Sequence, residues 1–509
     1  MVSELRTPSV QTEVTAKATT KDWLGLIVLA FAVLLIAVDG TVLDLALPFI
    51  SADLSPTSSQ LLWIIDVYSF VLAGLLITMG TLGDRIGRRK LLLIGAAGFG
   101  VASVVAAFSV SPEMLIAARV LQGLSGATLM PATLGLIRTM FADARQRTTA
   151  IGVWGAMAGG GAAAGPLVGG WLLEHFWWGS VFLINIPVMI ALILLGPLVI
   201  PESKDPKPGV FDLVSAGLSM LALVPLVYAV KETAAHGISV VNVLAAVVGI
   251  VAGVVFVRRQ RQLDDPMIDL RLFSNPAFST AVFTNFLSVF ALAGVLFFGA
   301  QYLQLVLGYS PLEAGLLMLP GTASSIVTSL VAAYLVRIWT PRTVLAGGLA
   351  VSAIGPALLY GLGVGTGPAL FIGGFVLVGA GAGIALTLTS DLVVGAVPPK
   401  KAGAASAVSE TAYELGIALG VAILGTVVMS FFRRGLDLSG LDPAQASAAQ
   451  ETLGGAVEVS RTLPDEAAAV LADSAHLAFV TGMHVASVAT AVVLAVTAVV
   501  VAVRLRARA

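Results

Sequence analysis

Apolar stretches of about 20 residues, separated by short polar turns, follow one another along most of the chain. An α-helix needs about 20 apolar residues to cross the hydrocarbon core of a bilayer, because each residue adds about 1.5 Å. The pattern therefore predicts fourteen transmembrane helices joined by mostly short connections. Their expected ranges are 23–48, 60–81, 91–110, 113–136, 148–172, 179–200, 211–231, 238–257, 278–304, 311–336, 342–363, 368–396, 404–431 and 477–503.

The composition also indicates an all-α membrane protein. Hydrophobic residues make up 58% of the 509 residues and charged residues only 11%, whereas soluble domains carry about 25% charged residues. The absence of cysteine excludes disulfides and thiolate chemistry. The net charge of −1 gives no reason to expect a nucleic-acid partner. The polar N-terminal tail lacks the apolar core of a cleaved signal peptide, so we expect the first span to remain as an anchor.

The basic residues predict the orientation in the membrane. If both termini are cytoplasmic, most of the 28 lysines and arginines fall in the inner connections, as the positive-inside rule requires. An odd number of spans would destroy this asymmetry. Arginine outnumbers lysine and alanine is abundant, which is typical of a high-GC bacterium. We therefore expect a multi-pass protein of the bacterial cytoplasmic membrane with both termini inside.

The two halves of the chain resemble each other weakly. The basic turn 337–342 joins spans ten and eleven, as the turn 83–90 joins spans two and three. We predict two six-helix bundles with two inserted helices between them, and internal repeats of this kind place a substrate site near the membrane midplane. The expected divisions are a tail at 1–22, an N-terminal bundle at 23–200, inserted helices at 211–257, a C-terminal bundle at 278–503 and a tail at 504–509.

One long external connection, at about 432–476, lies within the C-terminal bundle and is acidic. Its alanine-rich stretches 443–457 and 464–475 predict two short helices. The segment is either a solvated loop or a lid over the outer vestibule whose charge attracts cations.

Four acidic residues interrupt the apolar stretches: Asp39, Asp66, Glu410 and Glu414. A carboxylate at bilayer depth costs at least about 2.5 kcal/mol, so it usually faces the bundle interior and marks a path for protons, ions or cationic substrates. Glu410 and Glu414 are four residues apart and share one helix face, where they would titrate as a coupled pair. The alternatives are a purely structural hydrogen bond for Asp39, an interfacial role for Asp66 and a solvated vestibule position for Glu410.

Arg119 lies inside the fourth span. Its guanidinium does not lose its charge, so burial requires an acceptor; we expect it to organise a proton site or, alternatively, only to pack helices. The aromatic residues Trp63, Tyr68 and Tyr413 lie near the acidic positions in sequence. They are suited to hold a flat cation through cation–π contacts of about 0.5–2 kcal/mol each, although apolar packing is equally consistent.

The most specific motif is Gly80-Thr-Leu-Gly-Asp-Arg-Ile-Gly-Arg-Arg-Lys90, between spans two and three. Its glycines allow a tight turn and close helix approach, its aspartate can pair with a helix N-terminus or an arginine, and its arginines favour the cytoplasmic side. The string resembles the signature loop of the major facilitator superfamily, which latches the cytoplasmic gate in the outward-facing state. The residues that carry the resemblance are Gly80, Gly83, Asp84, Arg85, Gly87, Arg88 and Arg89.

Three further strings agree with this resemblance. Arg119-Val-Leu-Gln-Gly123 is similar to the family's buried-arginine motif, and the segment 39–48 is similar to the first helix of its fourteen-span drug:proton antiporters. A glycine-rich string in span five resembles the antiporter motif and is expected to bend the helix at its proline. Its residues are Gly161, Gly165, Pro166, Gly169 and Gly170.

The segments 63–68 and 409–416 resemble those of quaternary-ammonium and multidrug efflux proteins. The resemblance implies a major facilitator fold and export of lipophilic cations, such as ethidium and cationic biocides, in exchange for protons. The proton gradient would be the energy source, without cofactor, metal or enzymatic activity, and the protein would function as a monomer. Asp44 departs from the pattern, since relatives usually carry a small, apolar or amide residue there.

Other functions remain open at this point. One is the export of a single antibiotic or metabolite, and another is uncoupled facilitated transport. A channel lacks support because no ring of repeated polar filter residues is present. A non-transporting membrane sensor lacks support because no connection is long enough for a signalling domain. The chain has no nucleotide-binding glycine–lysine loop, so ATP is not expected as the energy source.

Overall fold

The computed structural model describes residues 17–505 apart from 55, 57, 205–211, 264, 265, 267 and 399–401. A few side chains within helices also lie outside the described set, among them those of Asp44, Asp66 and Pro166. Within the described residues the regular structure is entirely helical. The expected tails at 1–22 and 504–509 are therefore described only in part.

The first half of the chain forms the N-terminal bundle. Polar caps start several of its helices: the side chain of Ser111 accepts from the N–H of Met114, and that of Asp143 accepts from the N–H of Gln146. The helices are α1 (Thr20–Leu54), α2 (Ser58–Ile86), α3 (Arg88–Ala107), α4 (Pro112–Met140), α5 (Ala144–His175), α6 (Ser180–Leu183) and α7 (Asn185–Val199).

Two inserted helices, α8 (Leu213–His236) and α9 (Val240–Gln262), pack against each other, and α8 also contacts α2 and α14. The C-terminal bundle follows. Its elements are η1 (Leu270–Ser274), α10 (Pro276–Gln301), η2 (Tyr302–Val306), α11 (Pro311–Leu335), α12 (Pro341–Leu359), α13 (Ala369–Gly395), α14 (Ala402–Gly435), α15 (Pro443–Glu451), α16 (Leu453–Ser460) and α17 (Asp465–Arg504).

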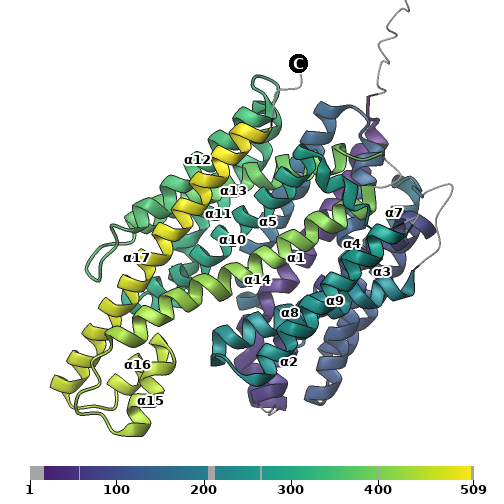
Figure 1. Cartoon of the computed structure of the whole chain (residues 1–509). Helices are drawn as coiled ribbons and strands as arrows, with labels where there is room; N and C mark the ends of the chain where they lie inside the picture. Colours follow the sequence, from purple (N-terminus) through teal and green to yellow (C-terminus); the bar gives the residue numbers. More distant parts are fainter. Residues whose placement is uncertain are drawn as a thin grey trace, which may run out of the picture.

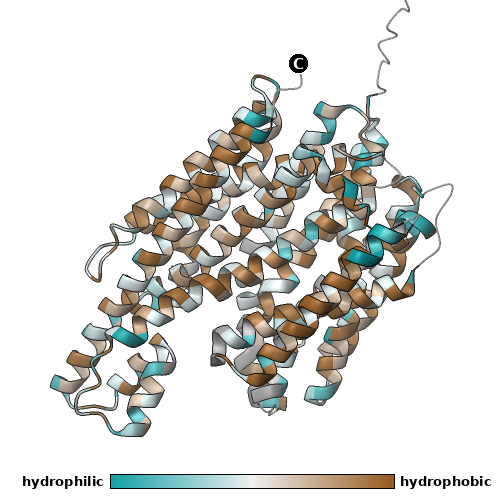
Figure 2. Cartoon of the chain, viewed as in Figure 1, coloured by the Kyte–Doolittle hydropathy of each residue, from teal (hydrophilic) through white to brown (hydrophobic). Residues whose placement is uncertain are grey.

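Twelve helical stretches among the described residues are long and apolar enough to cross a membrane. The short α6 and α7 together count as one, and α10 continues through η2. Apolar residues dominate the middle of the helices, and polar residues gather toward their ends (Figure 2). The all-α, multi-pass architecture is confirmed. Helices α2 and α5 are as long as their neighbours but are not among the twelve, so fourteen crossings remain a prediction.

The two bundles lie side by side and meet along a few helices (Figure 1). Helix α2 packs on α14, and α5 packs on α11. The second span of each bundle thus packs on the fifth span of the other, a reciprocal arrangement expected for an internal repeat. Helix α1 begins and α17 ends at the same end of the molecule, and α15 and α16 lie at the opposite end (Figure 1).

The acidic connection differs from the expected pair of short helices. The stretch 443–457 is split at Thr452, whose side chain caps α16 by accepting from the N–H of Gly455. The stretch 464–475 is instead the beginning of the 40-residue helix α17. Leu453 and Leu471 are buried with the core of the C-terminal bundle, so the segment packs as an ordered extension of that bundle.

Candidate functional site

Asp39 of α1 lies in a buried polar cluster inside the N-terminal bundle. It is 1% exposed, and Nη1 of Arg119 from α4 lies 3.1 Å from its Oδ2. Its Oδ1 accepts from Nδ2 of Asn185 at 2.8 Å and from Nε2 of Gln122 at 3.5 Å. Both carboxylate oxygens therefore receive donors, and the negative charge is compensated within the bundle.

Arg119 has the acceptors that its burial requires. Its Nη1 also donates to Oε1 of Gln122 at 3.1 Å, and its Nε donates to the carbonyl oxygen of Ile64 at 3.3 Å. Its guanidinium carbon lies 4.4 Å from the centre of the Tyr68 ring, a cation–π geometry. Gly123 of α4 makes this contact possible, because a Cβ there would lie 2.7 Å from the carbonyl oxygen of Tyr68.

Two members of the cluster escaped the sequence analysis. Ser103 of α3 accepts from Nε2 of Gln122 and from Nδ2 of Asn185, each at 3.0 Å. Both Ser103 and Asn185 are completely buried. The available signal was a lone polar residue inside an apolar span. Asn185 is such a residue, because an amide within the apolar stretch 179–200 needs a polar partner just as a carboxylate does.

Glu410 and Glu414 lie on α14 in the other bundle. Glu410 is 4% exposed, so it is not in a solvated vestibule, while Glu414 and Tyr413 are half-buried. Among the described residues no lysine or arginine forms an ion pair with Glu410. Asp39, Arg119 and Glu414 all lie near enough to the Tyr68 hydroxyl to act on it electrostatically. Tyr68 is therefore close enough to acidic groups of both bundles to interact with each electrostatically.

Two further predicted site residues, Asp66 and Trp63, belong to α2. The backbone of Asp66 lies within α2, but its side chain is outside the described residues. Trp63 is 41% exposed, and its ring centre lies 6.2 Å from that of Phe70. Phe70 in turn lies 6.5 Å from Tyr228 of the inserted helix α8. Trp63 thus belongs to an aromatic contact between α2 and α8 and not to the Asp39 cluster.

The basic turn after α2 joins the two bundles. Oδ1 of Asp84 lies 2.7 Å from both Nε and Nη2 of Arg88, and its Oδ2 accepts from the N–H of Ala404 at 3.1 Å. Asp84 therefore contacts both of its expected partners, an arginine and the N-terminus of a helix. Arg88 is completely buried and also donates to Ser203 at 2.9 Å.

The positions of this turn require glycine for different structural reasons. A Cβ at Gly80 would lie 2.7 Å from the carbonyl oxygen of Gly403, so Gly80 allows α2 to approach α14. Gly87 has a φ of +113°, which side chains rarely adopt. A Cβ at Gly83 would be tight against Leu91, at 3.3 Å. Of the two remaining arginines, Arg85 is exposed and Arg89 donates to the carbonyl oxygen of Ile200 at 2.9 Å.

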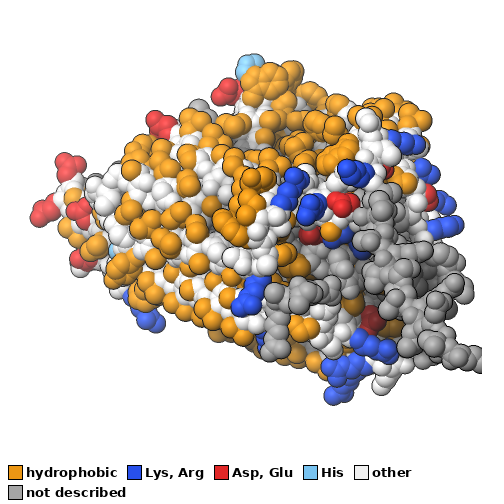
Figure 3. Space-filling model, turned by 90° about the horizontal axis from the view of Figure 1, so that it is seen from above, with side chains coloured by type: hydrophobic (Ala, Val, Ile, Leu, Met, Phe, Trp, Pro, Cys, Tyr) orange, Lys and Arg blue, Asp and Glu red, His pale blue; other side chains and the backbone are white. Residues whose placement is uncertain are grey.

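A second connection between the bundles involves Asp391, to which the sequence analysis gave no role. Oδ1 of Asp391 accepts from Nε of Arg147 at 2.6 Å, and its Oδ2 accepts from the hydroxyl of Thr148 at 2.7 Å. Nearby, Nε of Arg138 donates to the carbonyl oxygen of Val394 at 3.2 Å. These contacts lie at the end of the bundles that carries the chain ends. Lysine and arginine side chains gather on one half of the face seen from there (Figure 3).

The glycine-rich string of α5 packs against α1. A Cβ at Gly161 would collide with the carbonyl oxygen of Leu34, and one at Gly165 would collide with Oγ1 of Thr41. Gly169 is buried, whereas a Cβ at Gly170 would meet no atom within 4 Å. Helix α5 continues through the string from Ala144 to His175, and the side chain of Pro166 is outside the described residues.

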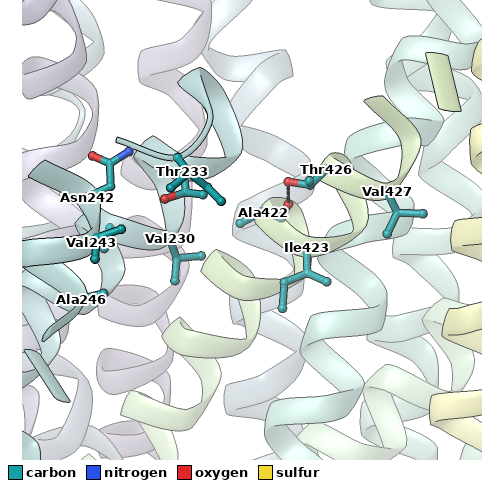
Figure 4. A pocket seen from close by; sticks show the side chains of 11 residues that line it. Val230, Thr233, Asn242, Val243, Ala246, Ala422, Ile423, Thr426 and Val427 are labelled. Atoms are coloured by element: carbon teal, nitrogen blue, oxygen red, sulfur yellow. Dashed lines mark hydrogen bonds between the residues drawn. The ribbon is translucent and has the colours of Figure 1, made fainter. Parts of the chain in front are cut away.

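A pocket of about 470 Å³ lies elsewhere, between the inserted helices and α14 (Figure 4). Its lining is mostly small and apolar, and the hydroxyl of Thr426 is already satisfied by the carbonyl oxygen of Ala422. None of the described residues that line it is charged. The buried carboxylate cluster around Asp39 is therefore the better candidate site.

Comparisons with known proteins agree with this architecture. The sequence model of the Major Facilitator Superfamily matches residues 29–421. The chain is 48% identical to the "Multidrug efflux pump LfrA" of Mycolicibacterium smegmatis, over 97% of this chain and 98% of that protein. It is 38% identical to the "Methyl viologen resistance protein SmvA" of Salmonella typhimurium, over 92% and 94%. It is 34% identical to the "Tetracenomycin C resistance and export protein" of Streptomyces glaucescens, over 94% and 91%.

Solved structures support the fold. The human organic anion transporter MFSD10 (TETRAN) aligns with a TM-score of 0.58 at 17% identity, covering 93% of this chain and 98% of that one. A bacterial homologue of the lysosomal transporter Spinster, inward-facing and unoccupied, aligns with a TM-score of 0.55 at 18% identity, covering 96% and 97%. With the family match over most of its length and these relatives, the chain is a multi-pass membrane protein that belongs to the major facilitator superfamily.

Proposed function

We propose that this protein is a proton-coupled multidrug efflux antiporter that exports lipophilic and quaternary-ammonium cations across the bacterial cytoplasmic membrane. The observation that carries the proposal is the pair of buried acidic sites, Asp39 in one bundle and Glu410 with Glu414 in the other. The names of two relatives point in the same direction, multidrug efflux and methyl viologen resistance. Methyl viologen is a flat molecule with two quaternary nitrogens.

The proposed topology has fourteen membrane crossings and cytoplasmic termini. Helices α2 and α5 would supply the two crossings beyond the twelve apolar stretches, since both are long and pack within the bundles. An even number of crossings agrees with the position of both ends of the described chain at one end of the molecule (Figure 1). The basic residues favour that end as the cytoplasmic one.

The proposed cycle follows alternating access. With the Asp84–Ala404 and Asp391–Arg147 contacts made, the cytoplasmic side is closed, so we assign this conformation to the outward-facing state. Protons from outside would neutralise Asp39 or the Glu410/Glu414 pair and release the cation. Deprotonation on the inside would restore the negative site. The membrane potential adds about 2.3 kcal/mol per charge moved through 100 mV.

The substrate would bind between the bundles, near Tyr68 and Tyr413. Tyr413 stands on α14 between the two glutamates in sequence, and the Tyr68 ring already covers Arg119. A cation would gain cation–π contacts there in addition to its attraction to the carboxylates. Trp63 is the weaker candidate, because it packs toward α8. No cofactor takes part in this scheme, and a single chain contains all the groups that it requires.

A narrow-specificity exporter is the second candidate. The relative from Streptomyces glaucescens is named for resistance to and export of one compound, tetracenomycin C. The same fold and proton sites would serve such a transporter. Resistance conferred against one compound class, and not against unrelated cations, would favour this candidate.

The test is drug-driven proton movement in liposomes. The protein is reconstituted with an acidic interior, ethidium or a quaternary ammonium is added outside, and internal pH is followed. We expect alkalinisation that depends on both the added cation and the protein. Cation uptake without a pH change would indicate an uncoupled facilitator, and the absence of both with folded, inserted protein would favour the narrow-specificity exporter.

A further inference from the structure

Asn185, at the start of α7, has an unusual pattern of hydrogen bonds. Its Nδ2 donates to Asp39 at 2.8 Å and to Ser103 at 3.0 Å, whereas its Oδ1 is buried and has no hydrogen-bond partner among the described residues. The side chain is completely inaccessible to solvent. A buried acceptor without a donor costs free energy, so an orphaned oxygen next to the acidic site requires an explanation.

The donors around Asp39 suit only its charged form. Arg119 has N–H donors and no acceptor, and Gln122 presents its Nε2 to the carboxylate and its Oε1 to Arg119. A protonated Asp39 has an O–H that needs an acceptor. Two buried acceptors near Asp39 have no partner among the described residues, the Tyr68 hydroxyl and Oδ1 of Asn185, and only Asn185 is in direct contact with Oδ1 of Asp39 in this structure.

We propose that Asn185 is a positioning residue that supports Asp39 in both protonation states by rotating its amide. With Asp39 charged, Nδ2 donates to the carboxylate, as the structure shows. With Asp39 protonated, a half-turn of the amide brings Oδ1 into that place to accept the O–H. Ser103, which now accepts from Nδ2, would then donate its hydroxyl proton to Oδ1, since a hydroxyl can either accept or donate. The inference rests on the proposed function only in that Asp39 exchanges a proton.

The groups that face Asp39 are few. From α4 it faces Arg119, from α2 the ring of Tyr68 lies over that arginine, and Glu414 of α14 acts on the Tyr68 hydroxyl. Helices α5, α6 and α7 also pack on α1, and their described ionisable residues, at the ends of α5, make no contact with the cluster. Asp66 lies on α2 with its side chain outside the described residues.

Hydrogen-bond strength determines the direction in which Asn185→Leu should shift the pH midpoint of Asp39. Asn185→Leu removes a donor from charged Asp39 and an acceptor from protonated Asp39. A hydrogen bond to a charged group is stronger than one between neutral groups, so the charged form loses more. The pH midpoint of the Asp39 titration should rise by about one unit, a tenfold change in proton concentration. Asn185→Ser keeps a group that donates and accepts, and should restore the midpoint.

Two readouts on the full-length protein test this. Infrared difference spectra against pH report a protonated-carboxyl band, assigned to Asp39 by its loss in Asp39→Asn. Exchange in the liposome assay is measured over the same pH range. Asn242→Leu is the matched control, because Asn242 is a buried amide that donates to the carbonyl oxygen of Gly237 and is remote from Asp39. The control should leave both midpoints unchanged.

The outcomes separate the two proposals. A raised infrared midpoint in Asn185→Leu and a wild-type value in Asn185→Ser support the role of Asn185, even if the wild type shows no antiport. An unchanged midpoint in a folded Asn185→Leu protein overturns it. So does a carboxyl band unaffected by Asp39→Asn, which would also remove Asp39 from the proposed proton path.

Discussion

The two bundles hold their acidic residues in opposite ways. In the N-terminal bundle, Asp39 is surrounded by donors and paired with Arg119 at 3.1 Å. In the C-terminal bundle, Glu410 is equally buried, but no described lysine or arginine pairs with it, and Glu414 shares its helix face. Burial of an uncompensated carboxylate is costly, whereas the same group beside an arginine is tolerated.

The difference suggests a division of labour between bundles. A compensated carboxylate holds helices α1, α4 and α7 together and changes its partners when its charge changes. Glu410, which has no cationic partner among the described residues, gains most from a proton or a cationic substrate, because either removes the unfavourable buried charge.

Amide substitutions should give the largest effect on transport. We expect Glu410→Gln combined with Glu414→Gln to reduce drug-driven proton exchange at least about 100-fold, or about 2.7 kcal/mol in the barrier. An amide can neither bind the proton nor attract the cation strongly. Asp39→Asn should reduce exchange to the same extent. Alkalinisation of liposomes measures it, and undiminished coupling in both variants would contradict the assignment of these carboxylates.

Stability should distinguish the two bundles. Arg119→Leu leaves Asp39 buried and unpaired, and should lower the free energy of unfolding by about 3–5 kcal/mol. Adding Asp39→Asn should recover part of this loss. Glu410→Gln should be neutral or stabilising, because it removes a buried charge without breaking an ion pair. Thermal unfolding in detergent compares these three variants with the unaltered protein. If Glu410→Gln lost as much stability as Arg119→Leu, the two bundles would not differ in how they compensate their buried carboxylates.

The closed end should depend on charge-assisted contacts between bundles. Asp391→Asn weakens the bond to Arg147, and Asp84→Asn weakens the bonds to Arg88 and Ala404. Each should shift the equilibrium toward opening at this end by about 1–2 kcal/mol, roughly tenfold. Labelling of a cysteine introduced at Ser329, which faces Gly152 of α5 across the bundles, would report the opening. If the cysteine at position 329 is labelled no faster in Asp391→Asn or Asp84→Asn than in the protein with both aspartates, these contacts do not hold this end closed.

The last effect concerns the packing that positions Asp39. Gly165→Ala should lower the free energy of unfolding by about 1–3 kcal/mol, because the new methyl group collides with Thr41 two residues from Asp39. Gly170→Ala in the same motif should stay within about 0.5 kcal/mol, since its Cβ would meet nothing. Thermal unfolding of both variants is the measurement. An equal loss of stability in Gly165→Ala and Gly170→Ala would show that α5 does not fix the position of α1.

Several features of the molecule could be predicted because they depend on local pattern. Twelve of the helical stretches follow from length and apolar composition, as bilayer thickness dictates. The motif after α2 indicated the family, which the sequence comparison confirms. The split of 443–457 at Thr452 was missed, because a helix cap interrupts an alanine-rich run that composition alone favours as one helix.

The sequence by itself determined that this is a helical membrane protein of the major facilitator superfamily with carboxylates in its spans. Only the tertiary structure decided which groups meet: Asn185 and Ser103 with Asp39, Asp391 with Arg147, and Glu410 without a cationic partner among the described residues. The physical reason lies in the solvent. In water a helix marks its buried face by an apolar stripe, but in lipid both the outer and the inner faces are apolar. The sequence therefore fixes where a helix crosses the membrane, while helix rotation and choice of neighbour arise from packing between distant segments.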